Sequence, residues 1–160
     1  MFVALTIVLM LRVNAQEWTL SVRGEVEHPL SITPEDFSKY PKTKVNVTNA
    51  KGETESYEGV LLFEILSRAG APLGDSTEHR NQTWYLRVKA RDGYKVIFAL
   101  PEIDSSFGEN AILLADRKNG AMLEKKFAPL QIVVPREHRH ARWIRQVESL
   151  EILNAEDVRK

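Results

Sequence analysis

The sequence predicts an α+β domain in which mixed or antiparallel sheets are accompanied by a few short helices. Several segments alternate apolar and polar residues with the period of a half-buried strand, as in Trp18–Val26 and Trp84–Ala90. Val60–Ala69 instead places apolar residues at the spacing of one helix face. No repeat, low-complexity stretch or interdomain linker divides the chain.

The first part of the chain predicts strand, helix and strand in turn. Trp18–Val26 alternates with period two and is expected to form a strand. A short helix is expected to start within Ser31–Phe37, because Thr33 can cap its N-terminus and Pro34 suits its first position. Lys44–Thr48 then reads as a second strand.

The middle of the chain predicts a helix followed by a β-hairpin. Apolar residues at 61, 62, 65, 66 and 69 give Val60–Ala69 one buried face, and Gly70 is a typical helix stop. Trp84–Ala90 and Tyr94–Leu100 are alternating segments joined by a turn that contains Asp92-Gly93, a strong hairpin signal. A further short strand is expected at Ala111–Ala115.

Length and composition limit the class of protein. At 160 residues the chain allows one domain, expected to span residues 16–160. Lys plus Arg and Asp plus Glu are equal at 22 each, so no overall field favours nucleic acid or an acidic membrane. The absence of cysteine excludes disulfides, thiolate catalysis and thiolate metal ligands.

Residues 1–15 resemble a secretory signal peptide. The apolar run before Arg12 is too short to cross a bilayer, which needs roughly 20 apolar residues. It suits the apolar part of a signal, with cleavage after Ala15, although the usual positive leader is missing. We therefore expect a periplasmic or secreted protein without a transmembrane span after cleavage; an uncleaved anchor or a core strand is the alternative.

The last third contains a basic loop between two expected strands, Leu130–Val134 and Trp143–Ile152. Its cationic or potentially cationic side chains are Arg136, His138, Arg139, His140 and Arg142. Such a cluster predicts an anion site, because guanidinium groups match phosphate or carboxylate oxygens. The alternative is a solvated loop paired with Glu137 or Glu148.

The remaining candidate groups predict little chemistry by themselves. His138 and His140 could share a metal ion, but two ligands beside several cations are insufficient, so no metal site is predicted. Tyr94 reads as an ordinary hairpin aromatic, and Glu102 and Asp104 as residues that open a turn or helix. Neither a Ser-His-Asp order nor a nucleotide fingerprint is present.

The order of features from Asp92 to Ile152 resembles the molybdopterin-binding core of the sulfite oxidase superfamily. The matching segments read DGYKVIFALPEID, AILLADRKNG and APLQIVVPREHRHARWIRQVESLEI, with Arg139-His140-Ala141-Arg142-Trp143 in place of the family's Arg-x-x-Lys-Trp loop. Upstream, Tyr57-Glu58-Gly59-Val60 resembles its Gly-Val-x-Leu helix start. The resemblance extends over most of residues 18–152 and implies the sulfite oxidase-like fold.

The resemblance also implies residue roles. Arg139, His140 and Arg142 would lie where the family binds the pterin and its phosphate, and Tyr94 where the oxidases place an active-site tyrosine. Thr48 or Asn49 would occupy the place of the cysteine that ligates molybdenum. Neither side chain can replace a thiolate, so molybdopterin is an expected ligand but thiolate-ligated molybdenum is not. The family's Arg after Pro-Leu is Gln131 here.

Three functions follow as alternatives. The first is a binding module that holds a phosphate-bearing ligand, or a periplasmic protein partner, through the basic loop. The second is a molybdopterin-dependent oxidoreductase in which the pterin dithiolene alone holds the metal. The third is a structural or accessory domain, because a fold does not fix a function.

Overall fold

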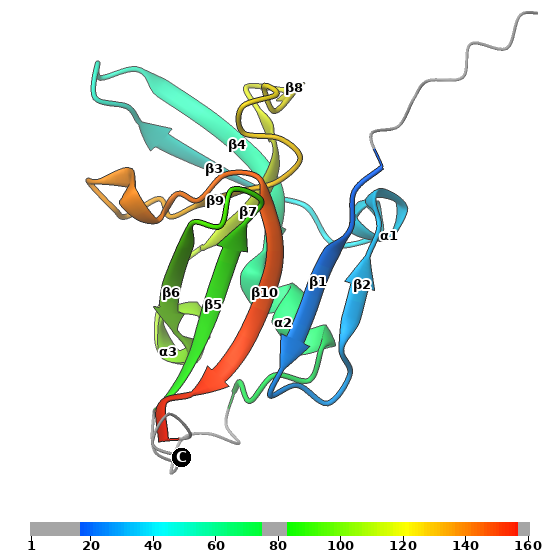
Figure 1. Cartoon of the computed structure of the whole chain (residues 1–160). Coiled ribbons are helices and arrows are strands. Elements are labelled where there is room, and N and C mark those ends of the chain that lie inside the picture. Colours follow the sequence, from blue (N-terminus) through cyan, green and yellow to red (C-terminus); the bar gives the residue numbers. More distant parts are fainter. Residues whose placement is uncertain (1–16, 75–82, 157–160) are drawn as a thin grey trace, which may run out of the picture.

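The computed structural model describes residues 17–74 and 83–156. Two sheets lie side by side in it (Figure 1). Sheet A has the order β2-β1-β10-β5-β6, and its strands are β1 (Leu20–Gly24), β2 (Leu30–Ile32), β5 (Trp84–Ala90), β6 (Lys95–Ala99) and β10 (Val147–Asn154). Sheet B has the order β3-β4-β7-β8, with β9 also paired to β7; its strands are β3 (Thr43–Thr48), β4 (Thr54–Leu61), β7 (Leu113–Lys118), β8 (Ala121–Met122) and β9 (Gln131–Val133).

Sheet A is mixed because of its central strand. β10 runs parallel to β1, with Ser21 opposite Ser149, and antiparallel to β5, with Ile152 opposite Leu86. β5 and β6 form the hairpin that the sequence predicts around Asp92-Gly93. The two halves of sheet A therefore meet only at β10.

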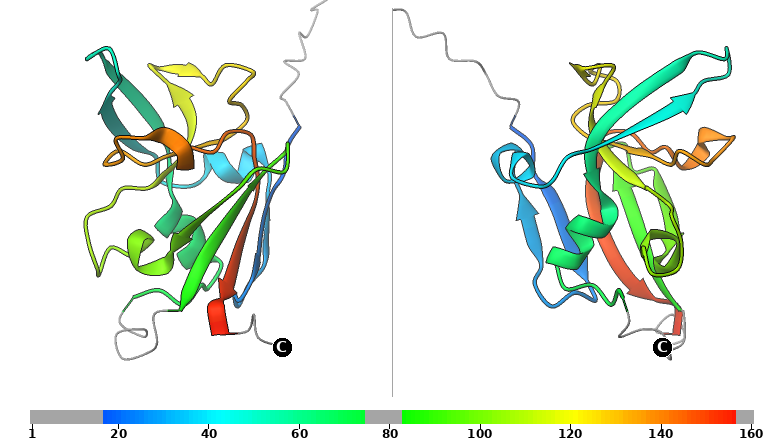
Figure 2. Two further views of the ribbon diagram at one scale, coloured as in Figure 1. Left: turned by 60° about the vertical axis from the view of Figure 1, so that its left-hand side comes forward. Right: turned by 180° about the vertical axis from the view of Figure 1, so that it is seen from behind.

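Short helices connect and cover the sheets. Their bounds are α1 (Pro34–Ser38), α2 (Leu62–Arg68), α3 (Leu100–Ile103) and the 3-10 turn η2 (His140–Arg142). Thr33 caps α1 as predicted, and its hydroxyl accepts the N–H of Asp36 at 3.2 Å. α2 covers one face of sheet A (Figures 1 and 2). No helix in the described ranges is both long and apolar enough to span a membrane.

One continuous core joins both sheets. Leu20 and Leu150 enter it from sheet A, Val60 and Leu114 from sheet B, and Ile65 from α2, and none of these five side chains is exposed. Burial of such apolar surface is the main favourable contribution to folding. The α+β class with mixed sheets and few helices is confirmed.

Some predicted boundaries were wrong. The helix expected from Val60 begins at Leu62, because Val60 and Leu61 complete β4 by pairing with Leu114 and Leu113 of β7. β4 itself was not predicted.

The strand expected from Trp143 begins only at Val147. The N–H of Trp143 bonds to the carbonyl of His140, and Gln146 has a φ of 53°, so this segment turns before it enters β10. The predicted signal peptide, residues 1–15, lies outside the described residues.

Candidate functional site

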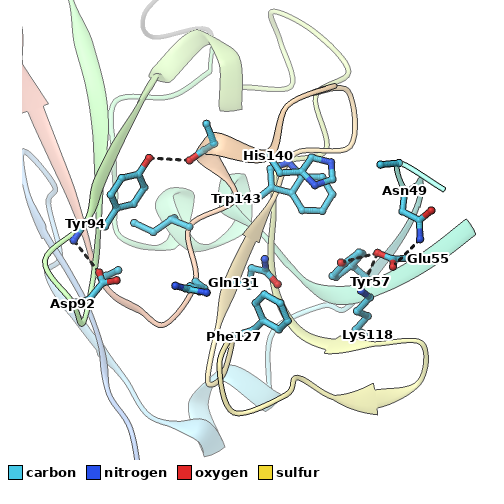
Figure 3. Close-up of a pocket in the computed structure, with 15 residues that line it drawn as sticks. Asn49, Glu55, Tyr57, Asp92, Tyr94, Lys118, Phe127, Gln131, His140 and Trp143 are labelled. Atoms are coloured by element: carbon cyan, nitrogen blue, oxygen red, sulfur yellow. Dashed lines mark hydrogen bonds and ion pairs between the residues drawn. The ribbon is translucent and has the colours of Figure 1, made fainter. Parts of the chain in front are cut away.

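A cleft of about 590 Å³ opens where sheet A, sheet B and the basic loop meet (Figure 3). Cavities that bind small organic ligands usually have about 300–1,000 Å³. The lining residues are Asn49, Ala50, Glu55, Tyr57, Ala90, Asp92, Tyr94, Lys118, Phe127, Gln131, His140, Ala141, Trp143, Ile144 and Arg145.

A hydrogen-bonded cluster centred on Glu55 forms one wall of the cleft. Glu55 and Tyr57 alternate along β4, and Lys118 lies opposite Tyr57 on β7. The Lys118 ammonium lies 2.9 Å from Glu55 Oε2, and the Tyr57 hydroxyl donates to the same oxygen at 3.1 Å. Asn49 Nδ2 donates to Glu55 Oε1 at 3.1 Å. Both oxygens of this carboxylate are therefore occupied (Figure 3).

The charges in this wall compensate each other. The hydrogen bond from Lys118 lowers the pKa of Glu55. Burial opposes the charged form of Lys118, but its hydrogen bonds to Glu55 and Tyr57 outweigh burial and raise the pKa of Lys118. Burial raises the pKa of Tyr57. At neutral pH the wall is an ion pair beside a protonated phenol, with no net charge.

The floor of the cleft contains an unpaired amide. Gln131 of β9 is 6% exposed, and its side chain forms no hydrogen bond within the described residues. The indole nitrogen of Trp143, another lining residue, is also buried without a partner there. Leaving a buried polar group unsatisfied costs about 1–3 kcal/mol. The indole nitrogen is closed off from solvent, whereas the Gln131 amide is not counted among the fully buried groups without a partner, so the amide is the group here that a polar ligand in the cleft can reach.

Arg145 supplies a positive charge beside this floor. An isolated antiparallel bridge pairs its backbone with that of Gln131. Arg145 is exposed, and its guanidinium has no ion pair or hydrogen bond among the residues described. His140 stacks on Trp143 with 3.7 Å between ring centroids, which places a second potentially cationic ring at the cleft.

Two arginines of the basic loop, Arg136 and Arg142, are paired with carboxylates. The Arg142 guanidinium pairs with Glu102 at 3.0 Å and with Glu137 at 2.5 Å. Its Nη1 also donates to the carbonyl of Ile97 on β6. Arg136 pairs with Glu109 at 3.5 Å. The pairing with Glu137 that the sequence left open as an alternative is thus present for Arg142.

The structure brings only part of the predicted site together. Asn49, Tyr94 and His140 line the cleft, whereas Thr48, Arg139 and Arg142 do not. Arg139 precedes η2 and is exposed, and Thr48 pairs with Thr54 at the end of the β3–β4 hairpin. Their roles in cofactor binding stay predictions.

Tyr94 occupies the cleft edge nearest the hairpin. Its hydroxyl donates to the carbonyl of Ala141 at 3.1 Å, and its backbone N–H bonds to Asp92 (Figure 3). With 53% of its surface exposed, the ring is half open to solvent. This geometry connects Tyr94 to the basic loop, and the catalytic role implied by the resemblance stays a prediction.

Five cleft residues were not predicted to act together from the sequence, because they come from separate segments of the chain: Glu55, Tyr57, Lys118, Gln131 and Arg145. Gln131 carried a recognisable signal, since it is a polar residue inside the apolar run of Leu130–Val134. No group of three or more His, Cys, Asp or Glu in the described parts of the chain could hold a metal ion.

Sequence comparison gives the family. Residues 7–159 match the sequence model of the oxidoreductase molybdopterin binding domain. The chain belongs to this family. A curated relative, the uncharacterized oxidoreductase YuiH of Bacillus subtilis strain 168, is 25% identical over 140 residues, which are 82% of this chain and 65% of the relative.

The fold is also similar to that of a solved structure. The sulfane dehydrogenase SoxCD from Paracoccus pantotrophus superposes with a TM-score of 0.67 at 21% identity. The match covers 84% of this chain and 38% of the SoxCD chain. The chain thus spans less than two thirds of either relative, and it corresponds to the cofactor-binding fold that the sequence predicts.

The cleft residues fit the organic part of molybdopterin but not a protein-ligated metal. The unpaired amide of Gln131 and the unpaired guanidinium of Arg145 can bind a polar ring and a phosphate. The chain has no cysteine, and Asn49, at the place implied for that ligand, donates to Glu55. A soft metal would find no thiolate here.

Proposed function

We propose that this protein binds a phosphate-bearing organic ligand of the pterin class in the cleft, with molybdopterin as the natural candidate. The observation that carries the proposal is Arg145, which lines the cleft and whose guanidinium has no acidic partner in the described part of the chain. A guanidinium can bind a phosphate through two parallel hydrogen bonds.

The anion contact that the sequence predicted at Arg142 is placed at Arg145 instead, three residues further along the same segment. Arg142 is engaged by two carboxylates, and Lys118 by one. Arg145 and His140 are the cleft's remaining cationic or potentially cationic side chains. An anion is therefore expected to lie near Arg145 and the His140–Trp143 stack, away from Glu55.

Redox activity is the second candidate and depends on the same ligand. When bound, molybdopterin would supply a redox-active metal through its own dithiolene, because the chain offers no thiolate. The protein's part would be to bind and orient the cofactor through Gln131, Arg145 and His140. Family membership as an oxidoreductase domain supports this candidate.

Cofactor content after purification tests both candidates. The protein should be isolated from a host that makes molybdopterin, and its pterin, phosphate and molybdenum should be measured per chain. We expect about one pterin per chain for the wild type. Arg145→Ala should lower this content at least about tenfold, the loss expected when a charged hydrogen bond of about 1.5–3 kcal/mol is removed.

Arg117→Ala is the matched control. Arg117 lies on β7 outside the cleft and has no ion pair in the described residues. It should retain wild-type pterin content. Pterin without molybdenum would support binding but contradict redox activity, and no pterin in the wild type would overturn the proposal.

We further propose that residues 1–15 direct export and that the domain acts in the periplasm or outside the cell, where a protein partner could exchange electrons with it. The support is the apolar run before Arg12 and Ala15 at a suitable cleavage point. Intact-mass measurement of the protein from the periplasmic fraction should find an N-terminus at Gln16. Full-length protein retained in the cytoplasm would contradict export.

A further inference from the structure

The amide of Gln131 is held in a fixed frame at the floor of the cleft. The backbone of Gln131 pairs on one side with Ala115 of β7 and on the other with Arg145. Its neighbours Leu130 and Ile132 are fully buried. The strand is thus built without help from the Gln131 side chain, which is left to face the cleft.

The amide of Gln131 has no hydrogen-bond partner among the described residues, although the residue as a whole is only 6% exposed. Its Nε2 offers two donors and its Oε1 accepts, and a ligand in the cleft can pair with both. Asp104, also buried, shows the usual solution, because its carboxylate accepts from Gly74 and from Ser106. For Gln131 no protein group takes this place among the described residues.

Flat side chains surround the amide. In Figure 3 Gln131 lies in the cleft with Phe127 on one side and Trp143 on the other, and all three line the cavity. Tyr57 packs edge-on against Trp143 at 5.7 Å between centroids. Aromatic walls favour a planar ligand, and an amide at the floor can pair with an edge that carries one donor beside one acceptor.

We propose that Gln131 determines ligand specificity by pairing with the donor–acceptor edge of a planar heterocycle, such as the lactam edge of a pyrimidinone or pterin ring. This inference rests on the proposed function and adds which edge of the ligand the protein recognises. An arginine at this position would favour an anion, whereas the amide favours a neutral edge.

Binding to the free protein tests the inference. The chain should be produced in a host that makes no molybdopterin, so that the cleft is free. Two fluorescent or competing probes should be titrated: 6-carboxypterin, and quinoxaline-2-carboxylate, which has a similar shape and charge but no donor–acceptor edge. We expect the wild type to bind 6-carboxypterin at least about tenfold more tightly.

Replacing Gln131 should change ligand binding but not stability, whereas replacing Gln146 should change stability but not ligand binding. Gln131→Met keeps the side-chain length without hydrogen-bonding groups; it should weaken 6-carboxypterin about tenfold, leave quinoxaline-2-carboxylate unchanged and not lower the melting temperature. Gln146 donates to the carbonyl of Lys125 and lies outside the cleft lining. Gln146→Met should therefore lower the melting temperature slightly and leave binding of 6-carboxypterin unchanged. Gln131→Glu provides a second variant of the same shape in which the donor is lost.

The outcomes separate the two claims. If the wild type binds both probes equally, or if Gln131→Met and Gln131→Glu bind 6-carboxypterin as tightly as the wild type, the specificity role of Gln131 is wrong while ligand binding stands. If the wild type binds neither probe, the proposed function fails and the inference fails with it. A lower melting temperature with unchanged binding in Gln131→Met would assign the amide a structural role.

Discussion

The hydroxyl of Tyr94 donates to the backbone carbonyl of Ala141, which joins the β5–β6 hairpin to the basic loop. Arg142, the next residue, reaches the carbonyl of Ile97 on the same β6 strand. The loop that carries His140 into the cleft is therefore fixed to the edge of sheet A at two successive positions. The shape of the cleft depends on these contacts.

Removing the Tyr94 hydroxyl should loosen the loop without unfolding the domain. For Tyr94→Phe we expect a loss of about 0.5–1 kcal/mol in the free energy of unfolding, because this hydrogen bond is partly exposed. Amide exchange in residues 138–142 should become faster. Tyr85→Phe is the control, since the Tyr85 hydroxyl has no hydrogen bond among the described residues. Unchanged exchange in Tyr94→Phe would argue against this role.

Arg142 should matter for stability more than its loop neighbours. Arg142→Ala leaves Glu137, whose side chain is 19% exposed, without its partner, so unfolding by urea should show a loss of about 1–3 kcal/mol. Arg136→Ala is the matched change, and it should have little effect because the Arg136–Glu109 pair is mostly exposed. If both variants lost the same free energy of unfolding, the half-buried cluster of Arg142, Glu102 and Glu137 would not be a stabilising element.

Gly59 should not tolerate a side chain. A Cβ there would overlap the carbonyl oxygen of Leu114, because β4 and β7 approach closely at a register shift beside Gly59. Gly59→Ala should lower the free energy of unfolding by about 1–3 kcal/mol. At Gly108 an added Cβ meets nothing within 4 Å, so Gly108→Ala should stay within about 0.5 kcal/mol of the wild type. A stable Gly59→Ala protein would show that the sheet can open at this point.

Asp104 should make stability depend on acid. Burial works to raise the pKa of Asp104, but hydrogen bonds from Ser106 and Gly74 outweigh it and lower that pKa. A carboxylate with a lowered folded-state pKa stabilises the protein above its unfolded pKa, and this contribution is lost as pH falls through the folded value. At neutral pH the wild type should therefore have a free energy of unfolding about 1–3 kcal/mol higher than that of Asp104→Asn, and this difference should shrink as pH falls through the folded-state pKa of Asp104.

The control for this pH dependence is Asp92→Asn. The Asp92 carboxylate accepts one backbone N–H in an exposed turn. The same chemical change should therefore have a smaller effect than Asp104→Asn at neutral pH. If the Asp104→Asn difference stayed constant from neutral pH to acid, the carboxylate of Asp104 would not be the stabilising group.

Local chemistry predicted the local structure well. The Thr33 cap and the Asp92-Gly93 hairpin are formed by residues within a few positions of one another, and both are confirmed. β4 was missed because its stability comes from β3 and β7, whose pairing a reading of Thr54–Leu61 alone does not reveal. The strand expected from Trp143 was wrong because the backbone turns at residues 143–146 before pairing resumes.

The site was less predictable than the fold. The basic residues of the loop were visible in the sequence, but the acids that neutralise Arg142 come from α3 and from the loop itself. Arg145, three residues further on, has no such partner among the residues described. Which of these two arginines is free for a ligand depends on tertiary contacts, and the residue types alone cannot distinguish Arg142 from Arg145.

The central place of β10 also governs how the chain folds. Val22 pairs with Leu150, so β1 and β5 remain separate until a strand made much later is inserted between them. Pairings between residues so distant in sequence make folding slow. During synthesis, sheet A exists at most as two isolated halves, and the newly made chain stays unfolded for longer than a domain of local hairpins would. Such an interval would serve the export proposed above, because a translocated chain must reach the translocation machinery before its core closes.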